Sequence, residues 1–314
     1  MAQFTWTFDA PTGTFKSHAM SKQLYLAAVE DSVFMDHVRP VQGYGKKMGE
    51  TVTLTRIRNI TEPTTGVLTE AERISEDPFV VNTRAITVVE FGRAVPYTSL
   101  AEDLSWFDLD NPIQNKLRNQ LRLVLDTRIA AAFTGAQLKY TPTGIASATT
   151  ATNGTAPAAA TGNVNFWHLE EVYDLLYDTY HTPPAVGDDY IGIFRNRGLR
   201  GVKRDPAWEE WHKYTDPASK FNGEAGRVER IRLIGTNHAN ALGNIGTSNV
   251  LGEGVVFGED AVVMAEVLSP EMRAAIPDDF GRNKAVAWYA ILEFAEVWNT
   301  ANAGEARIMH FAST

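Results

Sequence analysis

The spacing of apolar residues divides the first third of the chain into a helix and two strands. Residues 21–38 carry apolar side chains at helical spacing, which predicts a helix. Residues 47–60 and 79–95 alternate apolar and polar positions, which predicts two strands. The polar segment 61–77 between them contains turn residues, so the simplest arrangement is one long hairpin. Since such a ribbon is marginally stable alone in water, we expect it to lie on another surface, such as a neighbouring subunit.

The most regular helical pattern covers residues 112–135. Asn111 is expected to cap the N-terminus, with Pro112 in the first turn and Gln114 completing a capping box, and Gly135 is expected to end the helix. Apolar residues recur every three or four positions along one face, at Ile113, Leu117, Leu121, Val124, Leu125, Ile129 and Phe133. The other face carries Lys116, Arg118, Arg122 and Arg128 against a single acidic residue, Asp126. The pattern therefore predicts a rod of about 36 Å with a basic side.

The rest of the chain mixes one helix with several strands. Residues 141–162 are mostly Ala, Thr and Gly, which predicts a surface loop or an inter-domain connection. Residues 166–180 form an amphipathic helical pattern that ends before Pro183 and Pro184. Strands are predicted at 190–194, 228–234, 255–265, 285–298 and 307–311. The class is α+β with mostly antiparallel pairing.

Composition limits the kinds of protein that this chain can be. With 314 residues, of which 44% are hydrophobic and 21% charged, a folded protein of one large or two modest domains is expected. The net charge of -9 argues against a basic surface that grips DNA. The absence of cysteine removes disulfides, thiol nucleophiles and Cys-ligated metals. No stretch has the roughly 18 apolar residues that a membrane span requires, so no membrane association is expected.

Candidate catalytic groups are few. Asp174, Asp178 and His181 share a helical face and could hold a divalent metal, but a solvated face explains them better. Asp205, Glu209 and His212 have similar spacing, and for them an amphipathic surface or interface helix is favoured over a metal site. The common phosphate-binding, zinc-protease and serine-hydrolase motifs do not occur. We therefore expect no enzyme and no cofactor, and a metal-dependent hydrolase is kept only as a remote alternative.

Charge is distributed unevenly in two places. The tip of the predicted hairpin is acidic, with Glu70, Glu72, Glu76 and Asp77, whereas its base is basic. A run of cations between residues 195 and 204 contains Arg197, Arg200 and Arg204 and no acid. Such a run could contact phosphate or pair with a neighbouring subunit, and the acidic whole favours subunit pairing.

Several short segments, taken in order, resemble the coat proteins of podoviruses. The order of elements is similar as well: an arm, a long hairpin, a capped helix, a second domain and return strands. The segments are Gly49–Val52, Leu68–Glu70, Val89–Arg93, Asp126, Leu199–Arg200, Asp205 with Trp208, Phe221–Arg227, Val256–Ala261 and Asp279–Gly281. The resemblance as a whole spans residues 22–312. The chain is therefore identified as a member of the tailed-bacteriophage major capsid proteins with the Hong Kong 97-like shell fold.

The resemblance implies a domain plan. The expected parts are an N-terminal arm and first helix (1–38), an extended two-stranded E-loop (39–97), a P-domain with spine helix 112–135 (98–162), an A-domain (163–275), and return strands of the P-domain (276–314). In this family the A-domains meet at the capsomer centre and the E-loop lies over a neighbour. The acidic tip is expected to dock near the basic residues Arg118, Arg122 and Arg128 of a neighbour's spine helix.

The implied function is geometric. Identical chains would form the hexamers and pentamers of an icosahedral virion shell, assembled in the host bacterial cytoplasm around packaged DNA that is not bound by sequence. Expected partners are a separate scaffolding protein, a portal protein at one vertex and a possible decoration protein. The loop lysines lie at the base of the hairpin, so no covalent cross-link is expected. An encapsulin, a protein compartment with the same fold, is the main alternative.

Overall fold

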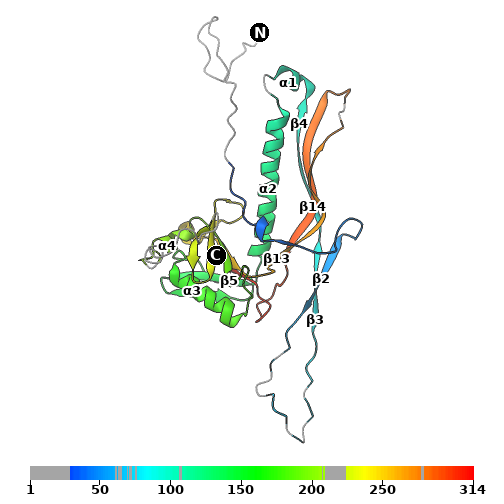
Figure 1. Cartoon of the computed structure of the whole chain (residues 1–314). Coiled ribbons are helices and arrows are strands. Elements are labelled where there is room, and N and C mark those ends of the chain that lie inside the picture. The colour runs from blue at the N-terminus through cyan, green and yellow to red at the C-terminus, as the bar shows by residue number, and fades with distance from the viewer. Residues whose placement is uncertain are drawn as a thin grey trace.

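The fold is described from a computed structural model (Figure 1). It describes residues 29–60, 62, 66–68, 70, 73–74, 76–105, 108–206, 208, 224–276 and 279–314. Three parts are visible: a long helix beside a sheet of long strands, a compact lobe on one side of it, and a hairpin that extends from its lower end. Of the helix expected at 21–38, residues 21–28 lie outside the described residues. Residues 29–34 are not helical, and only a single 3-10 turn, η1 (Met35–His37), follows, so that expectation is wrong for this part.

The long helix α2 (Asp110–Thr134) confirms the strongest sequence pattern. Its N-terminus lies ahead of the expected cap, because the Asp108 carboxylate accepts hydrogen bonds from Asp110 N (3.1 Å) and Asn111 Nδ2 (2.5 Å). Asn111 is thereby held by Asp108 instead of capping the helix itself. The helix ends at Gly135 as predicted. Short α1 (Ser99–Leu104) precedes it, capped by the Thr98 side chain, which accepts from Ala101 N.

A four-stranded sheet lies beside α2, in the order β1-β13-β14-β4. Its strands are β1 (Arg39–Pro40), β13 (Val262–Ala274), β14 (Asn283–Glu296) and β4 (Val89–Thr98). In the central strand β14, buried residues alternate with partly buried ones, as expected for a strand with one face on a core. The first half of α2 packs through Leu117 on Val286 and Trp288. The second half, from Leu125 to Phe133, joins a core shared with the lobe.

The hairpin is shorter than predicted. It consists of β2 (Thr51–Ile57) and β3 (Val81–Thr87), paired in register from Thr51↔Thr87 to Ile57↔Val81. The expected return strand 79–95 is two strands, since β3 ends at Thr87 and the chain continues after Val88 as β4 along β14. The reason is burial: Ile86, at the end of β3, packs with Val263 and Ala265 of β13, so the ribbon turns into the sheet there.

The compact lobe contains a seven-stranded mixed sheet in the order β6-β5-β15-β12-β7-β9-β8. These strands are β5 (Leu138–Gly144), β6 (Ser147–Ala151), β7 (Tyr190–Arg195), β8 (Glu224–Val228), β9 (Ile231–Thr236), β12 (Gly254–Phe257) and β15 (Ile308–Phe311). The helices are α3 (Phe166–Asp174), continued by the π turn η2 (Leu175–Thr179), and α4 (Leu199–Lys203). Small elements β10 (Asn244–Ile245), η4 (Thr247–Asn249) and β11 (Leu251–Gly252) complete the lobe.

Three expectations for the lobe are corrected. Residues 141–151 of the Ala, Thr and Gly segment predicted as a loop instead complete β5 and form β6, because these two strands pair with each other and Thr141 Oγ1 donates to Ala312 O at 2.6 Å. Residues 152–162 contain no helix or strand. The predicted strand 228–234 is a hairpin that turns at Glu229, which has a φ of +50°. The predicted strand 255–265 ends at Phe257, turns through Asp260, and resumes as β13 in the other sheet.

The chain crosses between the two sheets more often than the expected domain plan implies. Strand β15 (308–311) lies in the seven-stranded sheet between β5 and β12, although it was expected among the return strands at 276–314. Strand β13 lies in the four-stranded sheet, although its residues fall within 163–275. Each sheet is therefore assembled from distant parts of the sequence.

Candidate subunit interfaces

The β2–β3 hairpin projects away from the rest of the subunit (Figure 1). Its sides and tip carry large apolar side chains that are more than half exposed: Ile57, Ile60, Val67, Leu68, Ile74 and Phe79. A two-stranded ribbon with exposed apolar residues is marginally stable in water. The hairpin is therefore a surface that needs a partner.

Three arginines fix the direction in which the hairpin leaves the body. Arg58 Nε lies 2.6 Å from the buried carboxylate of Glu305. Arg84 lies 3.4 Å from Glu296, and Arg56 Nη1 donates to the Val297 carbonyl oxygen at 3.1 Å. Burial alone would raise the pKa of Glu305, but hydrogen bonds from Thr300, Asn302 and Arg58 hold it below its usual value. Burial raises the pKa of Glu296.

The acidic tip lies at the end of this hairpin. Glu70 and Asp77 are exposed, and Glu76 forms an ion pair with Arg73. Glu72 lies outside the described residues. Figure 1 shows the tip pointing away from the helix α2 of its own chain. Any contact between the tip and a spine helix must therefore be made with another copy.

The basic face of α2 is only partly available for such a contact. Arg118 and Arg122 are exposed, and Arg122 Nη2 lies 3.4 Å from the Glu30 carbonyl oxygen. Arg128 pairs with Glu293 of β14 at 2.6 Å and lies over the Phe91 ring. Its charge is therefore already compensated within the chain, whereas Arg118 and Arg122 have no carboxylate partner among the described residues.

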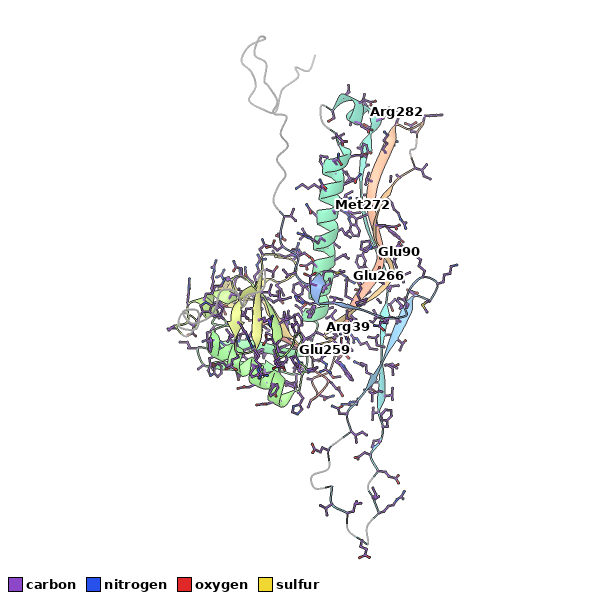
Figure 2. All side chains as sticks on the ribbon, in the orientation of Figure 1. Arg39, Glu90, Glu259, Glu266, Met272 and Arg282 are labelled. Carbon is purple, nitrogen blue, oxygen red and sulfur yellow. The ribbon has the colours of Figure 1, made fainter. Side chains whose placement is uncertain are left out.

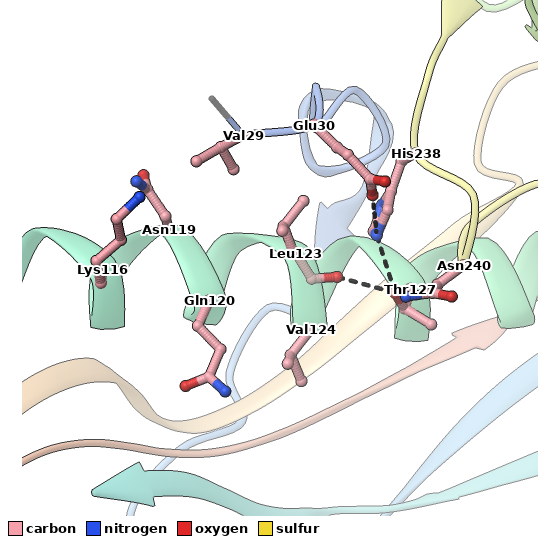
Figure 3. A pocket seen from close by; sticks show the side chains of 10 residues that line it. All are labelled: Val29, Glu30, Lys116, Asn119, Gln120, Leu123, Val124, Thr127, His238 and Asn240. Atoms are coloured by element: carbon pink, nitrogen blue, oxygen red, sulfur yellow. Dashed lines mark hydrogen bonds and ion pairs between the residues drawn. The ribbon is translucent and has the colours of Figure 1, made fainter. Parts of the chain in front are cut away.

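Asp126 is buried, although its place on the polar side of the helix pattern predicted exposure. Its Oδ1 accepts hydrogen bonds from Ser32 Oγ, Val33 N and Phe34 N at 2.9–3.1 Å. Its Oδ2 accepts from Nδ1 of the buried His238 at 2.9 Å. The carboxylate thus joins the N-terminal segment, the spine helix and the lobe. Its partner His238 lines a groove of about 560 Å³, together with Glu30, Lys116, Thr127 and others (Figure 3).

A second buried chain of polar groups lies inside the lobe. Lys139 Nζ donates to His310 Nδ1 at 2.9 Å, and His310 Nε2 donates to Glu253 Oε1 at 2.8 Å. Burial lowers the pKa of His310 and of Lys139. Burial alone would raise the pKa of Glu253, but its hydrogen bond from His310 contributes to a net lowering. A neutral imidazole that donates on one side and accepts on the other satisfies all three groups.

The upper end of the long sheet is apolar as well. Four large side chains there are more than 60% exposed, two on α1 and two in the turn between β13 and β14: Leu100, Leu104, Ile276 and Phe280. Arg282 marks this end in Figure 2, while Arg39 and Glu259, which pair at 3.4 Å, mark the junction with the lobe. The subunit therefore has unsatisfied apolar surface at both of its long ends.

The metal-site candidates find no support among the residues that the structure describes. Asp174, Asp178 and His181 are exposed, and no cluster of three ligand side chains suited to a metal is present in the described part. Of the second set, Glu209 and His212 lie outside the described residues. Arg200 on α4 and Arg204 at its C-cap are exposed, and Arg197 is partly buried just before the helix. Within the described ranges, no helix has the length and hydrophobicity to cross a bilayer.

Apolar surface at both ends and a projecting hairpin (Figure 1) are features of a subunit that packs against further copies or partners. The family comparison gives the same class: the chain belongs to the phage capsid family, whose model matches residues 17–194. It is accordingly a structural, non-enzymatic major capsid protein of the virion shell, which self-associates. A search of curated proteins found no match.

Solved structures share the fold over the whole chain. The capsid asymmetric unit of cyanophage Pam1 is 16% identical with a TM-score of 0.69, and the alignment covers 100% of this chain and 99% of that one. The head structure of Helicobacter pylori bacteriophage KHP40 is 14% identical with a TM-score of 0.72, covering 99% of each chain. The capsid of Ralstonia phage GP4 is 14% identical with a TM-score of 0.64, covering 99% and 97%. The predicted α+β, Hong Kong 97-like fold is confirmed.

Proposed function

We propose that this chain forms the hexamers and pentamers of an icosahedral shell that encloses packaged phage DNA. The observation that carries the proposal is the β2–β3 hairpin, which leaves the subunit with its apolar side chains exposed. Permanent interfaces of this kind bury on the order of 2,000 Å² or more, and a chain without cysteine relies on such non-covalent area. Neighbouring copies, repeated around the shell, offer every hairpin the same docking surface.

In this proposal the parts of the subunit take separate roles. The hairpin within residues 39–97 acts as the E-loop, α2 with the four-stranded sheet as the P-domain, and the compact lobe as the A-domain at the capsomer centre. The acidic tip, represented by Glu70 and Asp77, docks near Arg118 and Arg122 on a neighbour's spine helix. Complementary charge at such a contact fixes its register more than it adds affinity.

The enclosed DNA is contained and not gripped. Tight binding of DNA requires a surface lined with cations, and a chain with a net charge of -9 is poorly suited to form one. A neutral or acidic inner wall lets DNA move during packaging and release.

Further partners belong to the same proposal. Exposed apolar surface at both ends of the subunit is an aggregation hazard, which favours a separate scaffolding protein during assembly in the host bacterial cytoplasm. A portal protein would replace one pentamer to admit DNA, and a decoration protein would bind the finished shell.

Electron microscopy of the expressed chain, with nuclease treatment of the particles, tests the main proposal. The expressed chain should form regular closed shells, and particles from infected cells should contain DNA that the nuclease does not degrade. Soluble monomers at all concentrations, with or without scaffolding protein, would contradict the proposal, and shells filled with a specific protein cargo would instead indicate a compartment.

Charge reversal tests the docking of the tip. Reversing Glu70 and Asp77 to Lys should impair shell formation, and reversing Arg118 and Arg122 to Glu in the same chain should restore it. Glu76→Lys is the matched control, because Glu76 already pairs with Arg73 and should matter less. Normal shells from the singly reversed chains would rule out this contact while leaving the shell function intact.

A further inference from the structure

Two surfaces of the compact lobe carry opposite charge. The cationic α4 face consists of Arg200, Lys203 and Arg204, all exposed. The acidic α3 face consists of Glu170, Asp174, Asp178 and Glu229; the last three are exposed and Glu170 is half-buried. In Figure 1, α3 runs along the lower side of the lobe and α4 lies at its outer end.

Neither surface is neutralised within the described part of the chain. The cations of the α4 face form no ion pair there, and Asp174, Asp178 and Glu229 likewise have no cationic partner there. Arg230, which lies next to Glu229 in the same turn, pairs with Asp188 at 3.9 Å.

The acidic face repels itself. Burial raises the pKa of Glu170, and the charges of Glu229, Asp174 and Asp205 raise it further. All three neighbouring charges that act on Glu170 have the same sign as its own, so the cations of α4 do not compensate it. This face is therefore held at an electrostatic cost that a cationic partner would remove.

The two faces match in spacing. Glu170 and Asp174 lie four residues apart on α3, and Arg200 and Arg204 lie four residues apart across α4 and its C-cap. Residues at this spacing point to the same side of a helix, with Cβ atoms about 6 Å apart. Like charges at this spacing are unfavourable in the isolated helix, and each pair becomes favourable when it faces the other.

We propose that the cationic α4 face of one subunit docks on the acidic α3 face of the next subunit around a capsomer. A two-fold contact requires a patch that complements itself, which a purely cationic or purely acidic face cannot do. Because the two faces lie on different sides of the lobe (Figure 1), their pairing between copies is head-to-tail, and such contacts close into a ring where the rotation between neighbours allows it. The inference rests on the proposed function, because the ring is taken to be a capsomer. It gives the cations near residues 200–204 a contact with a second copy of this chain.

Charge-reversed chains test this contact. R200E/R204E places acid against acid, and E170K/D174K places cation against cation. Each variant should need a concentration at least about tenfold higher than the wild type to form shells, because like charges facing each other are strongly unfavourable. Added salt should reduce the difference, since these pairs are exposed. The chain with all four substitutions has both charges exchanged and should assemble as the wild type does.

Mixing the two singly reversed chains distinguishes contacts between copies from contacts within one. In a mixture, every acidic lobe can sit between two cationic lobes, so even-membered rings should form again. Five-membered rings cannot alternate, so closed shells should stay rare while hexamers recover. Circular dichroism of the unassembled chains checks that each variant is folded, and a variant that does not fold is replaced by R204E or D174K alone.

The outcomes separate the inference from the proposed function. If the wild type forms no shells, the proposed function fails. If the wild type forms shells and the reversed chains do so at the same concentration, only the α3–α4 contact is refuted. Normal shells of R200E/R204E that retain less DNA would also refute it, and would assign the cations to phosphate instead.

Discussion

Replacing Asp126 by alanine should destabilise the subunit strongly. The side chain is buried and accepts four hydrogen bonds, three from residues 32–34 and one from His238. Alanine leaves the buried amide of Phe34 and the imidazole of His238 without their acceptor. Each buried donor left without its acceptor costs about 1–3 kcal/mol, and two such donors remain. We therefore expect the free energy of unfolding to fall by about 3–5 kcal/mol, a large share of the roughly 5–15 kcal/mol typical of a domain.

Urea unfolding of the unassembled chain measures this loss, and hydrogen exchange locates it. The amides of Val33 and Phe34 should lose protection first, since their acceptor is gone. D126N is the matched variant: it keeps an oxygen facing the two amides and loses the charge, so its effect should be about half as large. A loss below about 1 kcal/mol for D126A, or unchanged protection at Phe34, would show that the carboxylate does not hold the N-terminal segment to the spine.

Three further outcomes are expected. Burial lowers the pKa of His310, so the unfolded chain binds more protons than the folded one. The free energy of unfolding should therefore decrease as pH falls below about 6.5, by up to about 1.4 kcal/mol per pH unit for this group. In H310Q, urea unfolding at a series of acidic pH values should show a weaker dependence of this free energy on pH. Gly201→Ala would place a Cβ against the Val164 carbonyl oxygen and should lower the free energy of unfolding, measured by thermal unfolding, by about 1–3 kcal/mol. Gly235→Ala, whose Cβ makes an ordinary contact with Leu199, should lower it less. Glu305→Ala removes an anchor of the hairpin, and limited proteolysis should then cut the hairpin faster at unchanged rates elsewhere.

The elements that the sequence predicted well are those whose own pattern decides their structure. Helix α2 follows the apolar period from Leu117 to Phe133, and β14 alternates along its length, so each could be recognised without knowing its neighbours. The segment now seen as β5 and β6 could not, because β5 is held in its sheet by pairing of Leu138–Tyr140 with β15, more than 150 residues later, and β6 then pairs with β5. Propensity gives no information about such a partner.

The same distinction holds for the candidate interfaces. The acidic tip and the basic spine face are visible as charge patterns, yet only the structure shows that Arg128 is already paired with Glu293. The helical pattern places Asp126 on the polar face. Its burial could not be predicted, because the residues that cause it lie about 90 and 110 positions away in the sequence. The sequence pattern is compatible with Asp174 and Asp178 as part of a metal site or of a solvated face. That their charge is complementary to the cations of α4 is visible only when both helices are placed in one lobe.

The position of β15 in the middle of the seven-stranded sheet sets the order in which the subunit can mature during synthesis. Strands β5 and β12 each pair with residues 308–311, so neither has its full set of neighbours until the ribosome has made residue 311. Helix α3, β7 and most of the lobe core are made long before that. The seven-stranded sheet therefore cannot be completed before residue 311 has been made, however early the other strands of the lobe begin to fold.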